Sequence, residues 1–286
     1  MTAGAVGQAA NVGEALAWAA AALSSAGVAE PRRDSEVLLG TVLGWERARL
    51  FAHPERELTA AEWRQFESWV AARTRRVPLQ YLTGRREFFE REFETSPEAL
   101  IPRPETELLV ERVIANAPAA GRILDAGVGS GAIAATLAER LPEATVFACD
   151  GSAAALGLAR RNAERLGGRV CFFQGDWLTA VRPGSLDVVV SNPPYIAADE
   201  RSQLEPEVLA EPPEALFAGQ DGLDAYRRLI PQAAAVLRPG GLLLLELGLG
   251  RLEGVSALLA VGPWKQPAVE PDLAGVPRTL AVRRFE

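Results

Sequence analysis

The sequence predicts an α/β protein that carries a small helical bundle at its N-terminal end. From about residue 105 onward, continuous apolar runs alternate with helical patterns, which indicates a mainly parallel sheet covered on both faces. Residues 1–77 show apolar residues at helical spacing and no strand pattern. The length of 286 residues also favours two domains. We therefore expect a helical domain over 1–77, a β-hairpin connector over 78–104 and an α/β domain over 105–286.

Three helices are predicted in the first 77 residues. The stretch "VGEALAWAAAALSSAG" has apolar residues at helical spacing, and "DSEVLLGTVLG" begins with Asp34 or Ser35 as its expected N-cap. The clearest helix is "LTAAEWRQFESWVAARTRR", in which Thr59 and Glu62 have the spacing of a capping box. The absence of turn-rich strand patterns in this region favours a small helical bundle.

The rest of the chain is predicted to form a hairpin and then alternating strands and helices. Aromatic and charged residues alternate around Gly84 in "LQYLTGRREFFEREFE", which favours a β-hairpin or an extended connector. Six later segments are predicted strands: "GRILDAG", "ATVFACDGS", "VCFFQGD", "LDVVVSN", "LLLLELG" and "TLAVRRFE". Three helices are predicted between them: "AIAATLAERLP", "AAALGLARRNAERLG" and "GLDAYRRLIPQAAAVL".

Composition and charge exclude several classes of protein. The net charge of −7 argues against a general nucleic-acid binder, which usually carries a basic surface. The one histidine, His53, is expected at a helix end on the surface, so neither a histidine triad nor a metal centre is predicted. Cys149 and Cys171 lie in apolar strand-like runs and are expected to be buried thiols. With no membrane-length apolar run and no basic start typical of a signal peptide, we expect a cytoplasmic protein.

A glycine-rich turn follows the first predicted strand of the α/β domain, in "ILDAGVGSGAIA". Gly127, Gly129 and Gly131 allow the backbone to turn sharply and to approach a ligand closely, with Val128 and Ser130 between them. Ligands of such folds bind at the carboxyl ends of the strands. The turn therefore predicts a site for a nucleotide-type cofactor, without choosing between NAD and S-adenosylmethionine.

Two further residues extend this predicted cofactor site. Asp150 ends the next strand, where a carboxylate can accept hydrogen bonds from both hydroxyls of a ribose. The spacing D-x-G-x-G-x-G resembles motif I of the class I methyltransferases, in which the turn holds the amino-acid end of S-adenosylmethionine. These enzymes place residues around the adenine after the third strand, so the resemblance implies an adenine contact for Trp177 in "GDW".

The fourth predicted strand ends in Asn192-Pro193-Pro194-Tyr195, at the same edge of the sheet and beside the methyl group of the expected cofactor. An amide or aromatic amine nitrogen is a poor nucleophile because its lone pair is delocalised. The Asn192 side-chain oxygen and the Pro193 carbonyl can accept both hydrogens of such an NH₂ group and orient it. The prolines stiffen the loop, and Tyr195 offers a flat face for a planar substrate. The loop leaves amide and adenine substrates equally open.

Six segments together resemble one family, the peptide chain release factor glutamine methyltransferases (the HemK/PrmC family). The loop "NPPY" is itself similar to that of methyltransferases that act on amide or exocyclic nitrogens, including DNA adenine-N6 enzymes. The matching segments are "PLQYLTGRREFF", "LIPRPETELLVE", "ILDAGVGSGAIA", "DWL", "SNPPYI" and "EPPEALFAGQDGLDAYRRL". They span most of the chain from residue 78 onward, whereas the helical N-terminal region fits the small substrate-facing domain of the family only in length and class.

The resemblance implies a fold, a reaction and a set of site residues. The fold is that of a class I S-adenosylmethionine-dependent methyltransferase with a mainly parallel seven-stranded sheet. The reaction is methylation of the glutamine in the Gly-Gly-Gln motif of class 1 release factors, giving N5-methylglutamine. The cofactor would contact Gly127–Gly131, Asp150, Trp177 and Asn192, and the glutamine would contact Asn192–Tyr195.

The segment "IPRPETE" implies the choice of substrate, because the related enzymes that act on a ribosomal protein glutamine differ after the arginine. The resemblance places Arg103 and Glu107 of this segment along the substrate channel. A different NH₂ substrate, such as DNA adenine, and a non-catalytic cofactor-binding module are the alternatives. The acidic net charge counts against DNA, and the intact "NPPY" counts against a silent module.

Overall fold

The computed structural model describes residues 10–286, and the chain divides into two compact units. The N-terminal unit contains the chain up to Gly84 together with Glu205–Ala210, and the α/β unit contains Arg85–Leu204 and Glu211–Glu286. This division differs from the ranges expected from the sequence, because the hairpin belongs to the α/β unit and a short later segment belongs to the N-terminal unit. Residues 1–9 of the helical domain predicted over 1–77 lie outside the described residues.

The N-terminal unit is helical, as predicted. Its helices are α1 (Val12–Ser25), α2 (Pro31–Leu43), α3 (Arg47–Ala52), α4 (Ala60–Thr74), α5 (Leu79–Thr83) and α9 (Pro206–Leu209). The capping box of Thr59 and Glu62 is confirmed at the start of α4. The prediction of Asp34 or Ser35 as an N-cap is wrong, because α2 begins at Pro31, whose fixed φ suits the first turn of a helix. Asp34 is instead buried and pairs with Arg73 of α4 at 2.8 Å.

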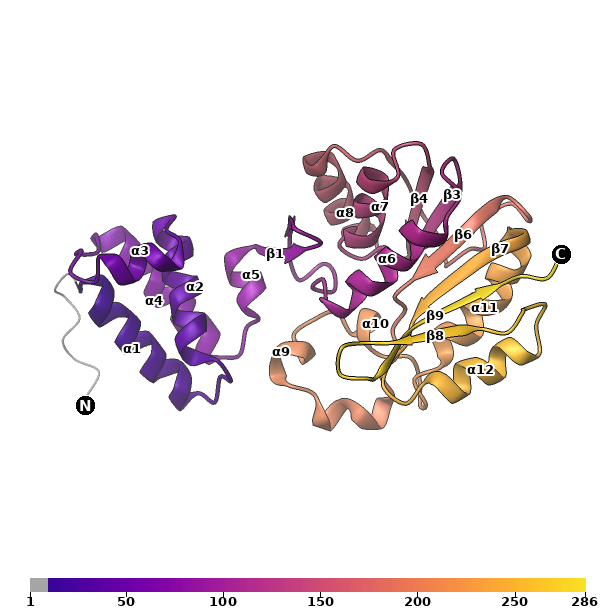
Figure 1. The fold of residues 1–286 in the computed structure, drawn as a ribbon. Coiled ribbons are helices and arrows are strands. Elements are labelled where there is room, and N and C mark those ends of the chain that lie inside the picture. The colour runs from indigo at the N-terminus through magenta and orange to yellow at the C-terminus, as the bar shows by residue number, and fades with distance from the viewer. Residues whose placement is uncertain (1–9) are drawn as a thin grey trace. The chain divides into compact units, whose positions relative to one another are not determined.

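The α/β unit is built on a seven-stranded sheet of order β5-β4-β3-β6-β7-β9-β8, and β9 runs antiparallel to its two neighbours (Figure 1). Its strands are β3 (Arg122–Ala126), β4 (Thr145–Asp150), β5 (Val170–Gln174), β6 (Leu186–Ser191), β7 (Leu237–Glu246), β8 (Ala268–Pro271) and β9 (Pro277–Arg283). The order reverses between β3 and β6, which is where ligands of parallel sheets bind. All six predicted strands are present, and β8 is a seventh that the sequence analysis did not locate.

Helices cover both faces of this sheet. The helices of this unit are α6 (Glu105–Asn116), α7 (Ala132–Arg140), α8 (Ala153–Leu166), α10 (Pro213–Leu216), α11 (Asp224–Val236) and α12 (Leu252–Ala260), with a 3₁₀ helix over Ala198–Gln203. Side chains of a strand alternate between its two faces. In β6, Val188 and Val190 therefore pack with α6, α7 and α8, whereas Val189 packs with α11 and α12. Because apolar side chains fill both faces of the sheet, the polar residues of a site are expected at the ends of the strands.

The predicted hairpin is present as β1 (Arg85–Phe88) and β2 (Arg91–Glu94). The side chain of Asn162, on α8, attaches it to the α/β unit. Its Oδ1 accepts from the Glu94 amide at 2.7 Å, and its Nδ2 donates to the Ser130 carbonyl at 2.9 Å. One fully buried amide therefore connects the hairpin to the glycine turn.

Three smaller expectations are also decided by the fold. Cys149 is buried, as predicted, but the prediction for Cys171 is wrong because β5 is an edge strand and leaves it exposed. His53 follows the last residue of α3, and its half-exposed side chain confirms the expected surface position. Among residues 10–286, no helix is long and apolar enough to cross a membrane.

Candidate active site

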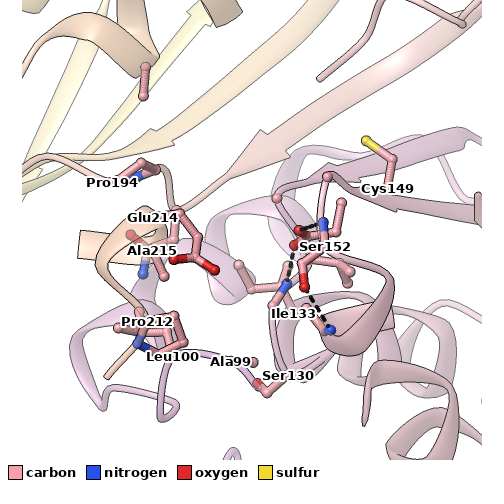
Figure 2. A pocket seen from close by; sticks show the side chains of 18 of the residues that line it. Ala99, Leu100, Ser130, Ile133, Cys149, Ser152, Pro194, Pro212, Glu214 and Ala215 are labelled. Carbon is pink, nitrogen blue, oxygen red and sulfur yellow. Dashed lines mark hydrogen bonds between the residues drawn. The ribbon is translucent and has the colours of Figure 1, made fainter. Parts of the chain in front are cut away.

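A cavity of about 800 Å³ lies at the carboxyl edge of the sheet, within the α/β unit. The turn after β3, the end of β4 and the loop after β6 line it, together with the segments around Ile101 and Phe217. Figure 2 shows Pro194, Pro212 and Glu214 on one side of the cavity and Ser152 and Ile133 on the other. The volume is in the range of pockets that enclose a small-molecule ligand, about 300–1,000 Å³.

The glycine turn forms one wall of the cavity. Gly127, Gly129 and Gly131 all have positive φ, at 78°, 53° and 85°, a conformation that disfavours other residues. A Cβ at Gly131 would lie 2.9 Å from the Ala159 Cα, so this glycine also allows α7 and α8 to pack closely. The turn thus places Gly127, Val128, Gly129 and Ser130 along the cavity, while Gly131 serves as the N-cap of α7.

Asp150 and Trp177 lie next to this turn. The two carboxylate oxygens of Asp150 accept from the amides of Gly129 and Ser152, both at 2.9 Å, which fixes the carboxylate at the rim of the cavity. Trp177 has a φ of 52°, and its ring contacts Gly127, where an added Cβ would meet it at 3.3 Å. Both predicted residues therefore line the same cavity as the turn.

Asn192 and Pro194 also line the cavity, and Pro193, between them, is buried. The position of Asn192 follows from the sheet, because β6 pairs in parallel with both β3 and β7 and ends at Ser191. Its Nδ2 donates to the hydroxyl of Thr106 at 3.1 Å. With the NH₂ end occupied in this way, the amide oxygen is the end left to accept a hydrogen bond.

Tyr195 does not line the cavity, although the sequence suggested a flat face toward the substrate. Its ring packs against Gly248, where an added Cβ would lie 2.5 Å from the ring. Its hydroxyl donates to Glu246 Oε1 at 3.4 Å, and its carbonyl accepts from Arg251 Nε at 3.0 Å. These contacts brace the loop that carries Asn192.

Arg103 and Glu107, both expected along a substrate channel, occupy different places. Arg103 lines the cavity and is ion-paired with the buried Glu211, whose second oxygen accepts from the Ile101 amide at 2.9 Å. Glu107 is not among the lining residues. Its carboxylate accepts from the Phe89 amide at 3.0 Å and so supports the tip of the hairpin.

Sequence reasoning did not single out three polar residues of this region: Thr106, Glu211 and Glu246. All three are buried, with at most 5% of their surface exposed. Glu246 follows four leucines in "LLLLE", and a carboxylate at the end of a buried strand is the signal that would have identified it. Burial raises the pKa of the Glu246 carboxyl to about 7, although the hydrogen bond from Thr106 opposes the shift.

The wall around Asp150 fits the nucleoside and amino-acid parts of S-adenosylmethionine. The space beside Gly129 is open, since a Cβ added there meets nothing within 4 Å. Asp150 has acceptor capacity beyond its two main-chain contacts, and Trp177 supplies a flat apolar surface. Among the described residues, no cluster of three or more His, Cys, Asp or Glu side chains is arranged to hold a metal ion.

Comparison with known proteins matches both parts of the chain. Residues 14–84 match the model of the PrmC N-terminal domain, and residues 104–220 match that of the methyltransferase small domain. The release factor glutamine methyltransferase of Moorella thermoacetica is 46% identical, covering 96% of this chain and 99% of its own length. That of Koribacter versatilis is 43% identical and covers 92% and 94%.

The chain belongs to the release factor glutamine methyltransferase family. A methyltransferase from Pyrococcus furiosus, of known crystal structure, is 20% identical with a TM-score of 0.54 and covers 70% of this chain and 91% of its own. This likeness shows the fold of a class I methyltransferase, as the resemblance implied. Most of the segment that matches the methyltransferase small domain lies in the α/β unit, in which the glycine turn and Asn192 line one cavity.

Proposed function

We propose that this protein transfers a methyl group from S-adenosylmethionine to the side-chain nitrogen of the glutamine in the Gly-Gly-Gln motif of class 1 release factors. The observation that carries the proposal is that Asn192 lines the same cavity as the glycine turn and Asp150. The relatives, which match nearly the whole chain at more than 40% identity, are named for a release factor glutamine, and this selects an amide over an adenine.

S-adenosylmethionine, when bound, supplies a methyl group on a sulfonium that is already activated for transfer. Gly127–Gly131 would hold its amino-acid end, Asp150 would accept from the ribose hydroxyls, and Trp177 would pack on the adenine. These contacts keep the cofactor on one wall of the cavity. The opposite wall is then free for the substrate amide.

Asn192 and Pro193 would orient the glutamine. The Asn192 Oδ1 and the Pro193 carbonyl each accept one hydrogen of the substrate NH₂, which turns the nitrogen lone pair toward the methyl group. The nitrogen would gain the methyl group as the bond from that group to the sulfonium sulfur breaks, which leaves S-adenosylhomocysteine. The cationic nitrogen would then readily lose one proton to solvent. No strong base is required, and the rate enhancement comes mainly from positioning.

Arg103, Pro194, Tyr195 and Glu107 have supporting roles in this proposal. Pro194 lines the glutamine side of the cavity, and Arg103 lies at its edge while its charge is balanced by Glu211. Tyr195 acts by holding the loop, through Glu246, and not by a face offered to the substrate. Glu107 supports the hairpin tip. The bound glutamine is therefore expected to contact Arg103 and Pro194 but not the other two.

Radiolabel transfer from S-adenosylmethionine tests the proposal. A purified release factor should take up label, and its Gln-to-Ala variant should take up none. Asn192→Ala should reduce kcat by about a hundredfold or more, because the substrate amide loses its acceptor. Asn192→Asp is the matched control, since it keeps a nearly equal shape and an acceptor but adds a charge.

The outcomes separate the substrates. Label on the Gln-to-Ala release factor would contradict the assignment of the glutamine. Label on adenine-containing DNA or on a ribosomal protein, with the release factor unlabelled, would assign the site to another NH₂ substrate.

A further inference from the structure

Asn192 and Glu246 lie at equivalent positions at the carboxyl ends of two adjacent strands. β6 and β7 are parallel with Ser191 beside Leu245, and each of the two polar residues follows by one position. Thr106, in the first turn of α6, lies between them. Its hydroxyl accepts from Asn192 Nδ2 at 3.1 Å and donates to Glu246 Oε2 at 2.6 Å. Three separate elements thus form one chain of hydrogen bonds.

The charge of Glu246 determines which group donates and which accepts in each of these hydrogen bonds. An ionised carboxylate can only accept, so the single hydrogen of the Thr106 hydroxyl points to Glu246. The lone pair of that hydroxyl is then available for the NH₂ end of Asn192. Thr106 and Glu246 are 5% and 1% exposed, so bulk water does not compete for these positions. The oxygen end of the Asn192 amide is left for the cavity.

We propose that Thr106 and Glu246 are positioning residues whose hydrogen bonds fix which end of the Asn192 amide faces the substrate. The proposal rests on the proposed function, because only an NH₂ substrate needs an acceptor at this place. An amide rotated by 180° would present a donor to the glutamine nitrogen and would repel it. We call the hydrogen-bonded chain of Asn192, Thr106 and Glu246 the relay. The relay therefore selects the one rotamer of Asn192 that can orient the substrate.

The carboxyl of Glu246 changes its charge near neutral pH. Burial raises the pKa of this carboxyl to about 7, and the hydrogen bond from Thr106 and the positive charge of Arg278 limit the rise. The groups that face it are Glu105 and Thr106 from α6, Tyr195 from the loop, Arg278 from β9 and, through its main-chain oxygen, Tyr226 from α11. Glu105 opposes ionisation, and Arg278 favours it.

Protonation of Glu246 reverses the direction of the relay. A neutral carboxyl has a hydrogen of its own, which it can donate to the Thr106 hydroxyl. The Thr106 hydrogen is then free to point to Asn192, where only Oδ1 can accept it. The NH₂ end of Asn192 turns to the cavity, and methyl transfer should fall as the pH drops below about 7.

Thr106→Val and Thr106→Ser form a matched pair that tests the relay. Valine keeps the shape of threonine without the hydroxyl, whereas serine keeps the hydroxyl. In labelled transfer to a release factor, Thr106→Val should lower kcat by about ten- to hundredfold with an unchanged dissociation constant for S-adenosylmethionine. Thr106→Ser should stay within a few-fold of the unsubstituted protein. Equal kcat for the two variants, with both folded, would overturn the proposal.

The pH profile gives a readout that a merely structural role would not change. The unsubstituted protein and Thr106→Ser should both lose kcat below about pH 7. Glu246→Gln keeps an acceptor for the Thr106 hydroxyl but cannot change its charge, so its kcat should not show this dependence. A limb near pH 7 that persists in Glu246→Gln would assign the titration to another group and would contradict the relay.

The side-chain NH₂ resonances of Asn192 test the relay without a substrate, so they remain informative if release factors prove not to be methylated. They can be assigned from their loss in Asn192→Asp. They should shift with a midpoint near pH 7 in the unsubstituted protein and should be insensitive to pH in Glu246→Gln and Thr106→Val. Resonances that do not titrate in the unsubstituted protein would overturn the relay, whereas absent labelling with normal titration would overturn only the proposed function.

Discussion

Two acidic residues of the α/β unit, Asp125 and Glu246, have buried carboxyl groups that lower the stability of the fold. Asp125 is fully buried at the end of β3, where burial raises its pKa well above the usual range, and one of its oxygens has no hydrogen-bond partner. Glu246 is in a similar position at the end of β7. Buried carboxylates of this kind are costly, and they cluster at functional sites. Both strands end at the edge of the sheet that carries the cavity.

Glu246 predicts a pH-dependent stability. Its pKa is about 7 in the folded protein and 4.5 without the fold, so between these values the folded protein binds more protons than the unfolded chain. The free energy of unfolding therefore falls as the pH rises from 4.5 to about 7, and it has lost the full contribution of Glu246 above about pH 7. At about pH 8, the free energy of unfolding of Glu246→Gln should exceed that of the unsubstituted protein by up to about 3 kcal/mol, and its melting temperature should be higher. Both gains should vanish near pH 4.5.

Thermal unfolding of the two proteins across this pH range measures the effect. The variant retains an acceptor for Thr106, and its new NH₂ can donate to the hydroxyl of Tyr195. A gain that is equal at both ends of the range would show that ionisation of Glu246 is not its cause. Together with the expected pH dependence of kcat in the unsubstituted protein, a gain only at high pH would show that stability is given up for the ionised Glu246 that orients Asn192.

At the scale of elements, α9 is held to the N-terminal unit by two arginines. The side chain of Arg73 is 7% exposed and bonds both Asp34, at 2.8 Å, and Glu207, at 2.6 Å. Arg76 donates to both oxygens of Glu207 at 2.6 Å and to Glu205 at 2.7 Å. The segment Glu205–Ala210 comes shortly after the loop that carries Asn192, so the chain leaves the α/β unit and returns within six residues.

Arg73→Ala should destabilise the N-terminal unit strongly. Removing one partner of a buried ion pair leaves the other charges without compensation, which typically costs about 3–5 kcal/mol. Arg33→Ala is the control, because Arg33 pairs only with Glu30 in a pair whose side chains are 65% and 60% exposed. Thermal unfolding and amide exchange of residues 205–210 measure the result. Equal effects of the two substitutions would contradict the role of the buried Arg73 in holding α9.

The whole molecule combines a helical unit with a separate α/β unit, and every residue that lines the cavity belongs to the second. S-adenosylmethionine should therefore raise the melting temperature of the α/β unit, by about 5 °C or more at a hundred times its dissociation constant. Amide exchange should slow around Gly127–Gly131 and Trp177. Asp150→Ala should reduce both effects, because the carboxylate contacts the turn and would accept from the ribose.

NAD is the control ligand for this experiment. The glycine turn alone is compatible with either cofactor, so thermal protection by NAD and not by S-adenosylmethionine would contradict the proposed function. Slowed exchange confined to α1–α4 would place the cofactor outside the cavity.

The sequence by itself determined the elements that depend on local signals. The six strands, the hairpin and the start of α4 follow from apolar periodicity, turn residues and capping, which act over a few neighbouring positions. The glycines of the turn and the loop Asn192-Pro193-Pro194-Tyr195 were visible for the same reason, because their backbone conformation is encoded in the residues themselves. That the turn, Asn192 and Pro194 line one cavity followed from the edge that parallel strands share.

Only the tertiary structure decided contacts between residues far apart in the chain. Arg103 pairs with Glu211, 108 residues away, and Thr106 with Glu246, 140 residues away, and no local pattern shows which residues will pair. The same limit explains why Tyr195 turns to Glu246 and why the exposure of Cys171 was missed, since the order of strands in the sheet placed β5 at its edge. Local sequence sets backbone geometry, but the direction in which a buried polar side chain points depends on partners that only folding brings within reach.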